Sequence, residues 1–414
     1  MEYNQRDIYI YILIMIKMPS KKTLTLILIV ITLIIIAPVV LRYTIIETLG
    51  NYRVKNNGRK ILLIYTGGTI GMVESSQGYV PKKHFLEKKL KTFLQMYPKD
   101  YTSIIADYDI HEMEPLLDSS NMTPEDWNKI ISSIENNYGK YEAFIVIHGT
   151  DTMAYSSSAV SFAFENLTKP IIFTGSQIPL ARVRNDGHLN LITSMILASN
   201  FDIPEVLLVF NNQILRGNRT SKISSNKLNA FESPNFPELG AFAYDKMPRI
   251  SDSLIRGSGF RTTVATKFNI EHKVVVIWLT PGIDFNTFRS IFLSDPTVKG
   301  LVLMTYGIGD GPTSNKQFIA FLSFLKERDI VVINKSQCIE GKVDQGDYQT
   351  GDLLRSNGVI SGVDMTTEAT YCKLVYLFSV YGNNTSMIRS MIDTNIRGEL
   401  SLKGTEKEFA ISNL

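Results

Sequence analysis

A short stretch at the end of an apolar run carries hydroxyl side chains among glycines. Residues 64–72 read IYTGGTIGM, so the apolar run ends in Thr66, Gly67, Gly68 and Thr69. Glycines allow backbone N–H groups to approach a ligand closely, and such groups can stabilise an oxyanion beside a threonine nucleophile. A tight turn with a capping threonine explains the same residues. The spacing matches neither the dinucleotide fingerprint nor the phosphate loop, so no nucleotide-binding motif is present here.

Three later apolar runs also end in polar side chains that could act in binding or catalysis. HGTDTMAYS places Thr150 beside Asp151, whose carboxylate can bind a substrate ammonium group or cap a helix. GSQIP follows at residues 175–179, and NNQILRGNRTSK ends at Lys222. This lysine is either an ordinary exposed side chain or a buried base that takes a proton from a hydroxyl.

Histidine and cysteine chemistry is not indicated. The five histidines lie neither in a GxSxG context nor at metal-ligand spacings, which argues against a Ser-His-Asp enzyme and against a zinc site. Cys338 and Cys372 are too few for a disulfide framework or a cysteine-rich metal site. We therefore predict no metal site.

Short apolar runs are expected to form the strands that position these residues. They end in Gly, Thr, Ser or Asn, are separated by helix-length segments, and read KILLIYTGG, AFIVIHGTD, PIIFTGSQ, VLLVFNN, VVVIWLTPG, GLVLMTYGIGDG and IVVINKSQ. This pattern predicts the α/β class, with parallel strands buried on both faces and helices as crossovers. Ligands bind beyond the carboxyl ends of such strands. A helix is expected to begin at Thr123, with Pro124 at its first position and Asp126 in its first turn.

The length of the chain and a change in composition predict its domains. A chain of 414 residues exceeds the size at which one core usually keeps growing, so two globular units are expected. The polar stretch around residues 247–266 has no clear period and is interpreted as a linker. The predicted divisions are residues 1–58 for an N-terminal segment with a polar linker, 59–246 for a larger first domain, 247–270 for the interdomain linker and 271–405 for a smaller second domain.

The N-terminal segment predicts a membrane location. Thr23 to Leu41 carries no charge and, at about 1.5 Å per residue, is long enough to cross most of a bilayer core. We expect one transmembrane helix that is retained as an anchor. Basic residues flank both ends, so the positive-inside rule does not decide the orientation. In a eukaryotic secretory lumen, glycans at the sequons of Asn121 and Asn218 would obstruct the polar cluster, so for a eukaryotic source we expect a cytoplasmic catalytic domain. For a bacterial source this argument does not apply, and an outward-facing domain is the alternative.

The charge of the chain argues against a nucleic-acid partner. The formal net charge is +3, and no Lys/Arg block is interleaved with aromatic residues as in nucleic-acid binders. We predict no nucleic-acid partner.

Together and in this order, the motifs resemble the bacterial-type L-asparaginases, and specifically their type I, "cytoplasmic" branch. The resemblance runs from about Lys60 to Leu402 and includes YTGGTIGM, QGYVP, PLLDSSNMTPEDW, HGTDTMAYS, TGSQIPL, RGNRT and GVDMTTEA. It implies a larger N-terminal domain with a parallel or mixed sheet and a smaller C-terminal α/β domain. The N-terminal apolar segment departs from this branch.

The resemblance also implies a reaction, namely hydrolysis of L-asparagine to L-aspartate and ammonia through a threonine nucleophile and an acyl-enzyme, without a cofactor. Thr69 matches the family's nucleophile, more firmly as an essential residue than as the first to attack. The other matched positions are the hinged-loop tyrosine Tyr79, the second threonine Thr150, its lysine partner Lys222, and the substrate contacts Ser119, Ser120 and Asp151.

Two further expectations concern assembly and regulation. The family works as homodimers or homotetramers with active sites at subunit contacts, so the loop that contains Asp310 is a candidate to reach a neighbour's site. Ser221 matches a position that lines a regulatory asparagine site in some type I members, where threonine is frequent.

Other functions stay open beside asparagine hydrolysis. An archaeal-type tRNA amidotransferase subunit would carry a folded N-terminal domain in place of the apolar segment. A lysophospholipase-like function belongs to larger relatives with ankyrin repeats, which are absent here, and glutaminase activity is also allowed. A membrane-tethered asparagine sensor would be favoured by loss of Thr69, Thr150 or Lys222, and all three are present.

Overall fold

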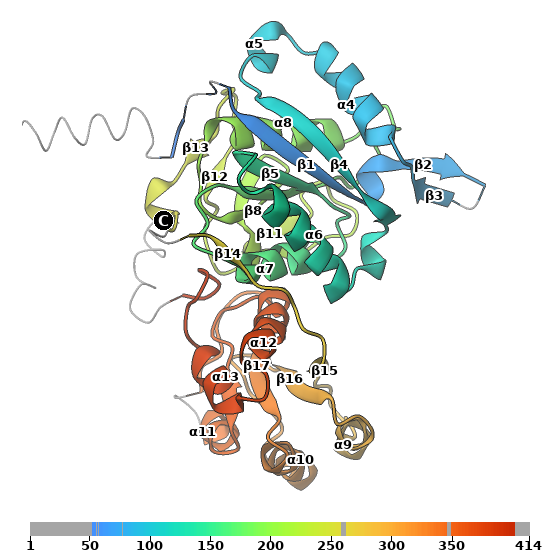
Figure 1. Cartoon of the computed structure of the whole chain (residues 1–414). Helices are drawn as coiled ribbons and strands as arrows, with labels where there is room; N and C mark the ends of the chain where they lie inside the picture. Colours follow the sequence, from blue (N-terminus) through green and yellow to red (C-terminus); the bar gives the residue numbers. More distant parts are fainter. Residues whose placement is uncertain are drawn as a thin grey trace, which may run out of the picture. The chain divides into compact units, whose positions relative to one another are not determined.

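The computed structural model describes residues 52–54, 56, 58–76, 78–257, 262–345 and 349–401. The chain divides into two units between Arg53 and Val54, and everything below concerns the second unit. This unit has a two-domain α/β fold with a large mixed sheet and a smaller parallel sheet (Figure 1). The predicted α/β class is confirmed.

The large sheet contains eight strands and lies in the N-terminal part of the unit. Their spatial order is β13 (Arg249–Ile250), β12 (Gly240–Ala241), β9 (Gln213–Arg216), β8 (Val206–Phe210), β7 (Ile171–Thr174), β5 (Ala143–Ile147), β1 (Lys60–Gly67) and β4 (Asp107–Leu117). The strands from β8 to β4 run parallel to one another, and the pairs β8–β9, β9–β12 and β12–β13 are antiparallel. The four central parallel strands β1, β5, β7 and β8 are almost wholly buried.

Helices cover both faces of the large sheet, as buried parallel strands require. The helices in this part of the unit are α4 (Phe85–Gln95), α5 (Lys99–Thr102), α6 (Pro124–Asn137), α7 (Met153–Ala163) and α8 (Gly187–Asn200), of which α6, α7 and α8 pack on the sheet. Helices α6 and α7 share a core with one face of β1, β5 and β7, whereas α8 packs against the other face (Figure 1). The predicted start of α6 is confirmed, because Pro124 follows the N-cap Thr123, whose N–H donates to the Asp126 carboxylate at 3.1 Å.

The small sheet contains four parallel strands in the C-terminal part of the unit. In spatial order they are β15 (Lys273–Trp278), β16 (Val298–Thr305), β17 (Val331–Ser336) and β18 (Val359–Ser361). The surrounding helices are α9 (Phe285–Ser294), α10 (Lys316–Glu327), α11 (Gln349–Ser356), α12 (Thr367–Tyr381) and α13 (Thr385–Met391). All seven apolar runs that the sequence predicted as strands are strands in the two sheets.

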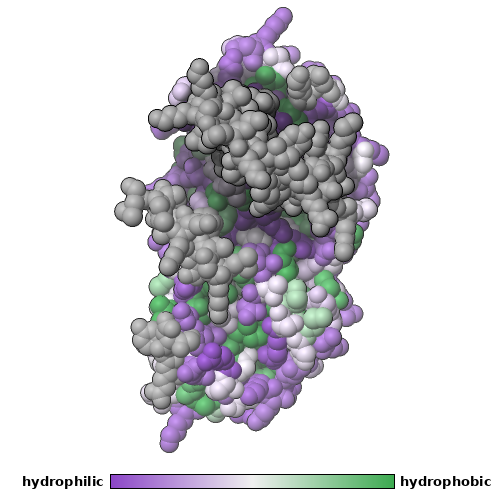
Figure 2. All heavy atoms as spheres, turned by 90° about the vertical axis from the view of Figure 1, so that its left-hand side faces the viewer, coloured by the Kyte–Doolittle hydropathy of each residue, from purple (hydrophilic) through white to green (hydrophobic). Residues whose placement is uncertain are grey.

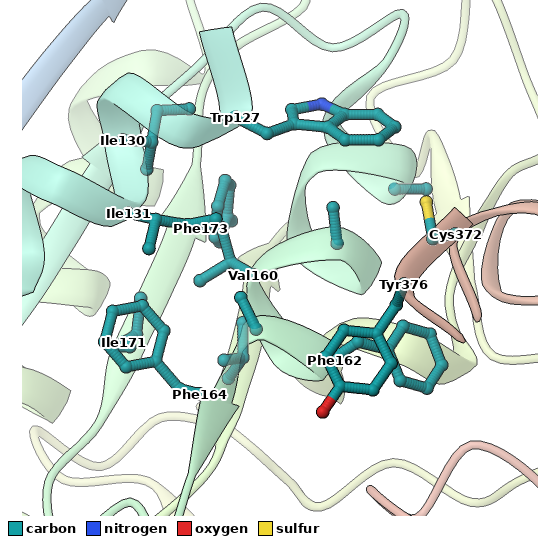
Figure 3. Packing of buried hydrophobic residues seen from close by; sticks show 14 of the residues in the cluster. Trp127, Ile130, Ile131, Val160, Phe162, Phe164, Ile171, Phe173, Cys372 and Tyr376 are labelled. Carbon is teal, nitrogen blue, oxygen red and sulfur yellow. The ribbon is translucent and has the colours of Figure 1, made fainter. Parts of the chain in front are cut away.

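The two sheets share part of one hydrophobic core. Figure 3 shows Trp127 of α6 and Phe162 of α7 in the same cluster as Cys372 and Tyr376 of α12. The rings of Phe162 and Tyr376 stack with centroids 5.9 Å apart. Helix α7, MAYSSSAVSFA, is rich in small side chains and packs closely against α12, to which it also contributes the ring contact of Tyr155 with Tyr371.

The range predicted as an interdomain linker, residues 247–270, contains strands of two different sheets. Strand β13 belongs to the eight-stranded sheet, and β14 (Val264–Ala265) pairs with β6 (Phe164–Glu165). The predicted divisions 59–246, 247–270 and 271–405 stay a prediction.

The predicted single-pass membrane location is contradicted. Among the residues that the structure describes, no helix is both long enough and apolar enough to cross a membrane. The longest of them, α12, has 15 residues and spans about 23 Å, less than the roughly 30 Å of a bilayer core. Residues 23–41, on which the prediction rested, lie outside the described residues.

The visible surface is mixed in character. On the face shown in Figure 2, the described residues display small hydrophobic groups between hydrophilic ones. Such a mixture is ordinary for a folded protein, because apolar atoms always form a large share of the surface.

Candidate active site

Three neighbouring strands end together at one edge of the large sheet. Strands β1, β5 and β7 are parallel and adjacent, with Tyr65 opposite Ile147 and Ile147 opposite Thr174. The residues that follow them are the three polar turns singled out in the sequence. The carboxyl edge of the sheet therefore gathers these turns in space, as expected for an open parallel sheet.

The turn after β1 approaches the turn after β5 at backbone distance. Gly67 and Gly68 have φ angles of 121° and 81°, which favour glycine. A Cβ atom on Gly68 would lie 2.3 Å from the Cα of Gly149, so only glycine fits. Thr69 and Thr150 each directly follow one of these two touching glycines in the chain.

The other threonine of the turn has a structural role. The hydroxyl of Thr66 donates to the carbonyl of Ile147 at 3.1 Å and is buried. This bond ties the end of β1 to the end of β5. Thr69 is half-buried and begins the 3-10 helix η2 (Thr69–Gly71).

Lys222 joins the second threonine and the acidic residue into one cluster. It lies on the two-residue strand β10 (Ser221–Lys222), and its Nζ is 2.8 Å from Thr150 Oγ1 and 2.6 Å from Asp151 Oδ1. The side chain of Lys222 is 16% exposed and that of Asp151 is 59% exposed. The lysine is thus mostly enclosed while the carboxylate faces solvent, from which a cationic group can reach it.

Gln177 and Asp186 belong to the same cluster and were not singled out in the sequence. The Thr150 hydroxyl donates a hydrogen bond to Gln177 Oε1 at 3.1 Å. The Asp186 carboxylate accepts the backbone N–H groups of Gln177 and Ile178, both at 2.9 Å, and so fixes the loop between β7 and α8. The third strand end, GSQIP, was noted only as a strand end. The edge argument that selected Thr150 applies equally to Gln177 and could have found it.

The two predicted substrate-contact serines lie beside this cluster in the 3-10 helix η3 (Ser119–Asn121). Ser119 is buried, and its hydroxyl fills the space where a Cβ on Gly149 would stand. Thr152 donates to the carbonyl of Ser119 at 2.7 Å. Ser120 is exposed, and its N–H donates to the Asp118 carboxylate.

Tyr79 lies on a hairpin that follows the turn of Thr69. The hairpin consists of β2 (Met72–Ser75), directly after η2, and β3 (Gly78–Pro81), which carries Tyr79. The residue is 36% exposed, and its ring contacts the guanidinium group of Arg182.

No described group of three or more His, Cys, Asp or Glu side chains is arranged to hold a metal.

Comparisons with known proteins show the family of the chain. Residues 60–253 match the family model "Asparaginase, N-terminal", and residues 273–392 match "Glutaminase/Asparaginase C-terminal domain". The chain is also 44% identical to L-asparaginase 1 of Escherichia coli K12, over 83% of this chain and 98% of that protein.

The chain belongs to the asparaginase family.

Further similarities support a type I-like asparaginase. L-asparaginase I from Vibrio cholerae has a solved structure that matches with a TM-score of 0.74 and 38% identity, over 84% of this chain and 100% of that one. The 60 kDa lysophospholipase of Mus musculus is 36% identical over 84% of this chain and 64% of that longer protein. As a member of the asparaginase family, the chain is an enzyme of the amidohydrolase class.

In this asparaginase the C-terminal part holds the loop that carries Lys222. Arg219 is buried and donates to the Asp364 carboxylate at 3.1 and 2.8 Å. Burial opposes ionisation of Asp364, but the hydrogen bonds and charge of Arg219 prevail and lower the pKa of that carboxyl. Ser221 donates to Glu368 at 2.8 Å, and burial raises the pKa of Glu368.

The buried histidine of the asparaginase turn HGTDT is neutral at ordinary pH. Burial lowers the pKa of His148 to about 4, although its bond with the Gly149 carbonyl, at 2.7 Å, acts in the opposite direction. A neutral ring that donates through Nδ1 leaves Nε2 as an acceptor, and this atom has no hydrogen-bond partner among the described residues. His148 is therefore a packing group of the turn.

Proposed function

We propose that this protein hydrolyses L-asparagine to L-aspartate and ammonia through a threonine nucleophile and an acyl-enzyme intermediate. The observation that carries the proposal is the contact of Lys222 with both Thr150 and Asp151, at 2.8 and 2.6 Å. This cluster combines groups for proton transfer with a carboxylate that can bind the ammonium group of an amino acid. Membership of the asparaginase family supports the same substrate.

Substrate binding is assigned to polar groups at the carboxyl edge of the sheet, of which Asp151 and Ser120 are exposed and Ser119 is buried. The Asp151 carboxylate takes the α-ammonium group, and the hydroxyl groups of Ser119 and Ser120 take the α-carboxylate. With both α-groups held, the side-chain amide is directed to the turn that contains Thr69. Fixing both ends limits how far the amide can reach, so asparagine is preferred over glutamine.

The chemical step is acyl transfer to a threonine hydroxyl and then to water. The Thr69 oxygen adds to the amide carbon while backbone N–H groups of the glycine turn stabilise the oxyanion. The C–N bond breaks, and the nitrogen leaves as ammonia with the proton taken from the hydroxyl. Water then attacks the ester carbon, which releases aspartate and restores the hydroxyl. Thr150 and Lys222 relay the protons, and Tyr79 closes the site.

The test is ammonia release by the purified full-length protein, with L-asparagine and L-glutamine measured side by side. We expect a higher kcat/KM for asparagine. One methylene is worth about 1–3 kcal/mol in a simple pocket, so the ratio is expected to be roughly 10 to 200. Equal kcat/KM values would contradict the proposed fixing of both α-groups.

Assays on the same purified protein also test two alternative functions, a sensor and a lysophospholipase-like enzyme. Tight binding of asparagine without ammonia release would indicate a sensor. Because of the similarity to the mouse lysophospholipase, release of fatty acid from lysophosphatidylcholine is measured as a third reaction. Fatty-acid release without ammonia release would replace the asparaginase proposal.

We also propose that the enzyme acts as a homodimer or homotetramer. Val276 and Trp278, 44% and 54% exposed, stand on the edge strand β15 and are apolar groups that a second copy can cover. Asp310, whose carboxylate accepts a bond from Thr350, stays a candidate contact to a neighbour's site. Light scattering during size exclusion measures the number of copies.

A regulatory role of Ser221 stays a prediction. Its hydroxyl is buried and bonded to Glu368. A second asparagine molecule would have to replace this bond. Sigmoidal dependence of rate on asparagine, abolished in Ser221→Ala, is the measurement that supports regulation there.

A further inference from the structure

The hairpin that carries Tyr79 has little burial to hold it. Gly78, Tyr79 and Val80 are exposed, and Pro81 is half-buried. Figure 1 shows β2 and β3 projecting away from the large sheet. A tyrosine that works at the site from such a hairpin needs another contact to fix the position of its ring.

Arg182 supplies a contact of this kind. Its guanidinium carbon lies 5.5 Å from the centroid of the Tyr79 ring, within the range of about 6 Å for a cation–π interaction. The arginine backbone is held in a turn, because its N–H donates to Pro179 at 2.9 Å and its carbonyl accepts from Asn185 at 2.8 Å. Its guanidinium makes no hydrogen bond or ion pair with another described residue, so the tyrosine ring is its specific partner there.

The loop that carries Arg182 is anchored to the catalytic turns. This loop between β7 and α8 contains Gln177, which accepts a hydrogen bond from the Thr150 hydroxyl. Further along, the Leu180 N–H donates to the carbonyl of Ile70 at 3.1 Å, one residue after Thr69. Arg182 therefore extends from a base that is fixed relative to both threonines and reaches the hairpin opposite.

We propose that Arg182 is a positioning residue that holds the β2–β3 hairpin against the β7–α8 loop by stacking on Tyr79. The role of Tyr79 in catalysis rests on the proposed function, whereas the contact itself does not. We call the hairpin closed when Tyr79 contacts Arg182, as in the structure, and open when this contact is broken. The cation on the face of the ring stabilises the closed conformation relative to the open one. At an exposed position such a contact shifts this equilibrium by about two- to fivefold.

Limited trypsin digestion of the full-length protein measures the open hairpin without reference to activity. Lys82 and Lys83 lie at the end of the hairpin. The rate of cleavage after them is proportional to the fraction of molecules with an open hairpin when opening and closing are fast relative to cleavage. We expect Arg182→Gln to raise this cleavage rate about two- to fivefold and Arg182→Lys to restore much of the difference. Arg184→Gln is the matched control, because Arg184 is exposed and makes no hydrogen bond, ion pair or cation–π contact with another described residue.

Kinetics in two tyrosine backgrounds test whether Arg182 acts through the ring. Arg182→Gln is expected to lower kcat/KM about two- to fivefold in wild type and equally in Tyr79→Phe, which keeps the ring. In Tyr79→Leu, which lacks the ring, the same substitution is expected to have no effect on cleavage or kinetics.

The outcomes separate this inference from the proposed function. Equal cleavage rates for Arg182→Gln and Arg184→Gln, or an undiminished effect in Tyr79→Leu, overturns the role of Arg182 even if asparagine is hydrolysed. If no substrate is hydrolysed but cleavage responds to Arg182 only in the presence of the ring, the positioning contact stands and the proposed function fails.

Discussion

The Nζ atom of Lys222 lies 2.8 Å from the hydroxyl oxygen of Thr150, although 72 positions separate the two residues in the chain. The same nitrogen lies 2.6 Å from the Asp151 carboxylate. One lysine therefore contacts the hydroxyl proposed for proton transfer and the carboxylate proposed for substrate binding. In the proposed reaction, the substrate ammonium group competes with Lys222 for this carboxylate, which would couple substrate binding to proton transfer.

Removal of a reacting group should abolish turnover but leave the fold intact. We expect Thr69→Ala, Thr150→Ala and Lys222→Met each to lower kcat at least about 1000-fold, because each removes a nucleophile or a proton-transfer group. Steady-state ammonia release measures the loss, and circular dichroism checks the fold. Thr92→Ala is the control, because the Thr92 hydroxyl only bonds the Lys88 carbonyl on an exposed helix face. Near wild-type turnover in Thr69→Ala would refute the mechanism.

Substitution of Gln177 should lower kcat, although Gln177 does not contact the substrate in the proposed reaction. Gln177→Leu removes the acceptor of the Thr150 hydroxyl, and we expect kcat to fall about 10-fold because a buried donor is left unpaired. Gln213→Leu, a change of the same type on β9, is the matched control. Unchanged kcat in Gln177→Leu would show that the orientation of the Thr150 hydroxyl is set elsewhere.

Acid should destabilise the protein through His148. Its pKa falls from 6.5 to about 4 in the folded state because of burial, so the unfolded chain binds a proton more readily. The stabilisation is present above pH 6.5 and is lost as the pH falls towards 4, by roughly 3 kcal/mol. Urea unfolding across this window measures the slope. His148→Gln should lack this part of the pH dependence, and an unchanged slope in the variant would contradict the assignment.

The buried ion pair of Arg219 and Asp364 should be important for stability. Arg219→Met leaves a carboxylate buried without its partner, for which we expect a loss of about 3–5 kcal/mol in the free energy of unfolding. Lys267→Met provides the contrast, because Lys267 and Glu135 are 38% and 46% exposed and such pairs contribute below about 1 kcal/mol. Similar losses in both variants would contradict the assigned difference in burial.

The central strands were predictable from the sequence because they are buried on both faces. Runs such as AFIVI in β5 are continuous and apolar, and they require no knowledge of their neighbours. Strand β4, DYDIHEMEPLL, lies at the sheet edge, is largely accessible and carries charged residues, so no apolar run marks it. The two-residue strands β12 and β13 are too short for any period. These elements depend on tertiary pairing for their existence.

The residues of the candidate site were predictable from the sequence, but most of the contacts between them were not. The sequence identified Thr150 and Lys222 as candidates, because each follows an apolar run, and the structure places them in contact. The sequence gives no distance between such residues, so the bond from Thr150 to Gln177 could not be read from it. The contact of Arg182 with Tyr79 is equally hidden, since it joins two exposed segments that no periodicity connects.

Helix α12 has a consequence for how such a chain can evolve. It packs on the small sheet and also supplies Cys372, Tyr376 and Phe378 to the core around α7. Recombination that joins the first half of this gene to the second half of a distant relative must therefore preserve one particular face of a helix. Tyr155 and Phe162 of α7 and the rings of Tyr371 and Tyr376 that they contact on α12 are expected to vary together, as a matched set inherited in one piece.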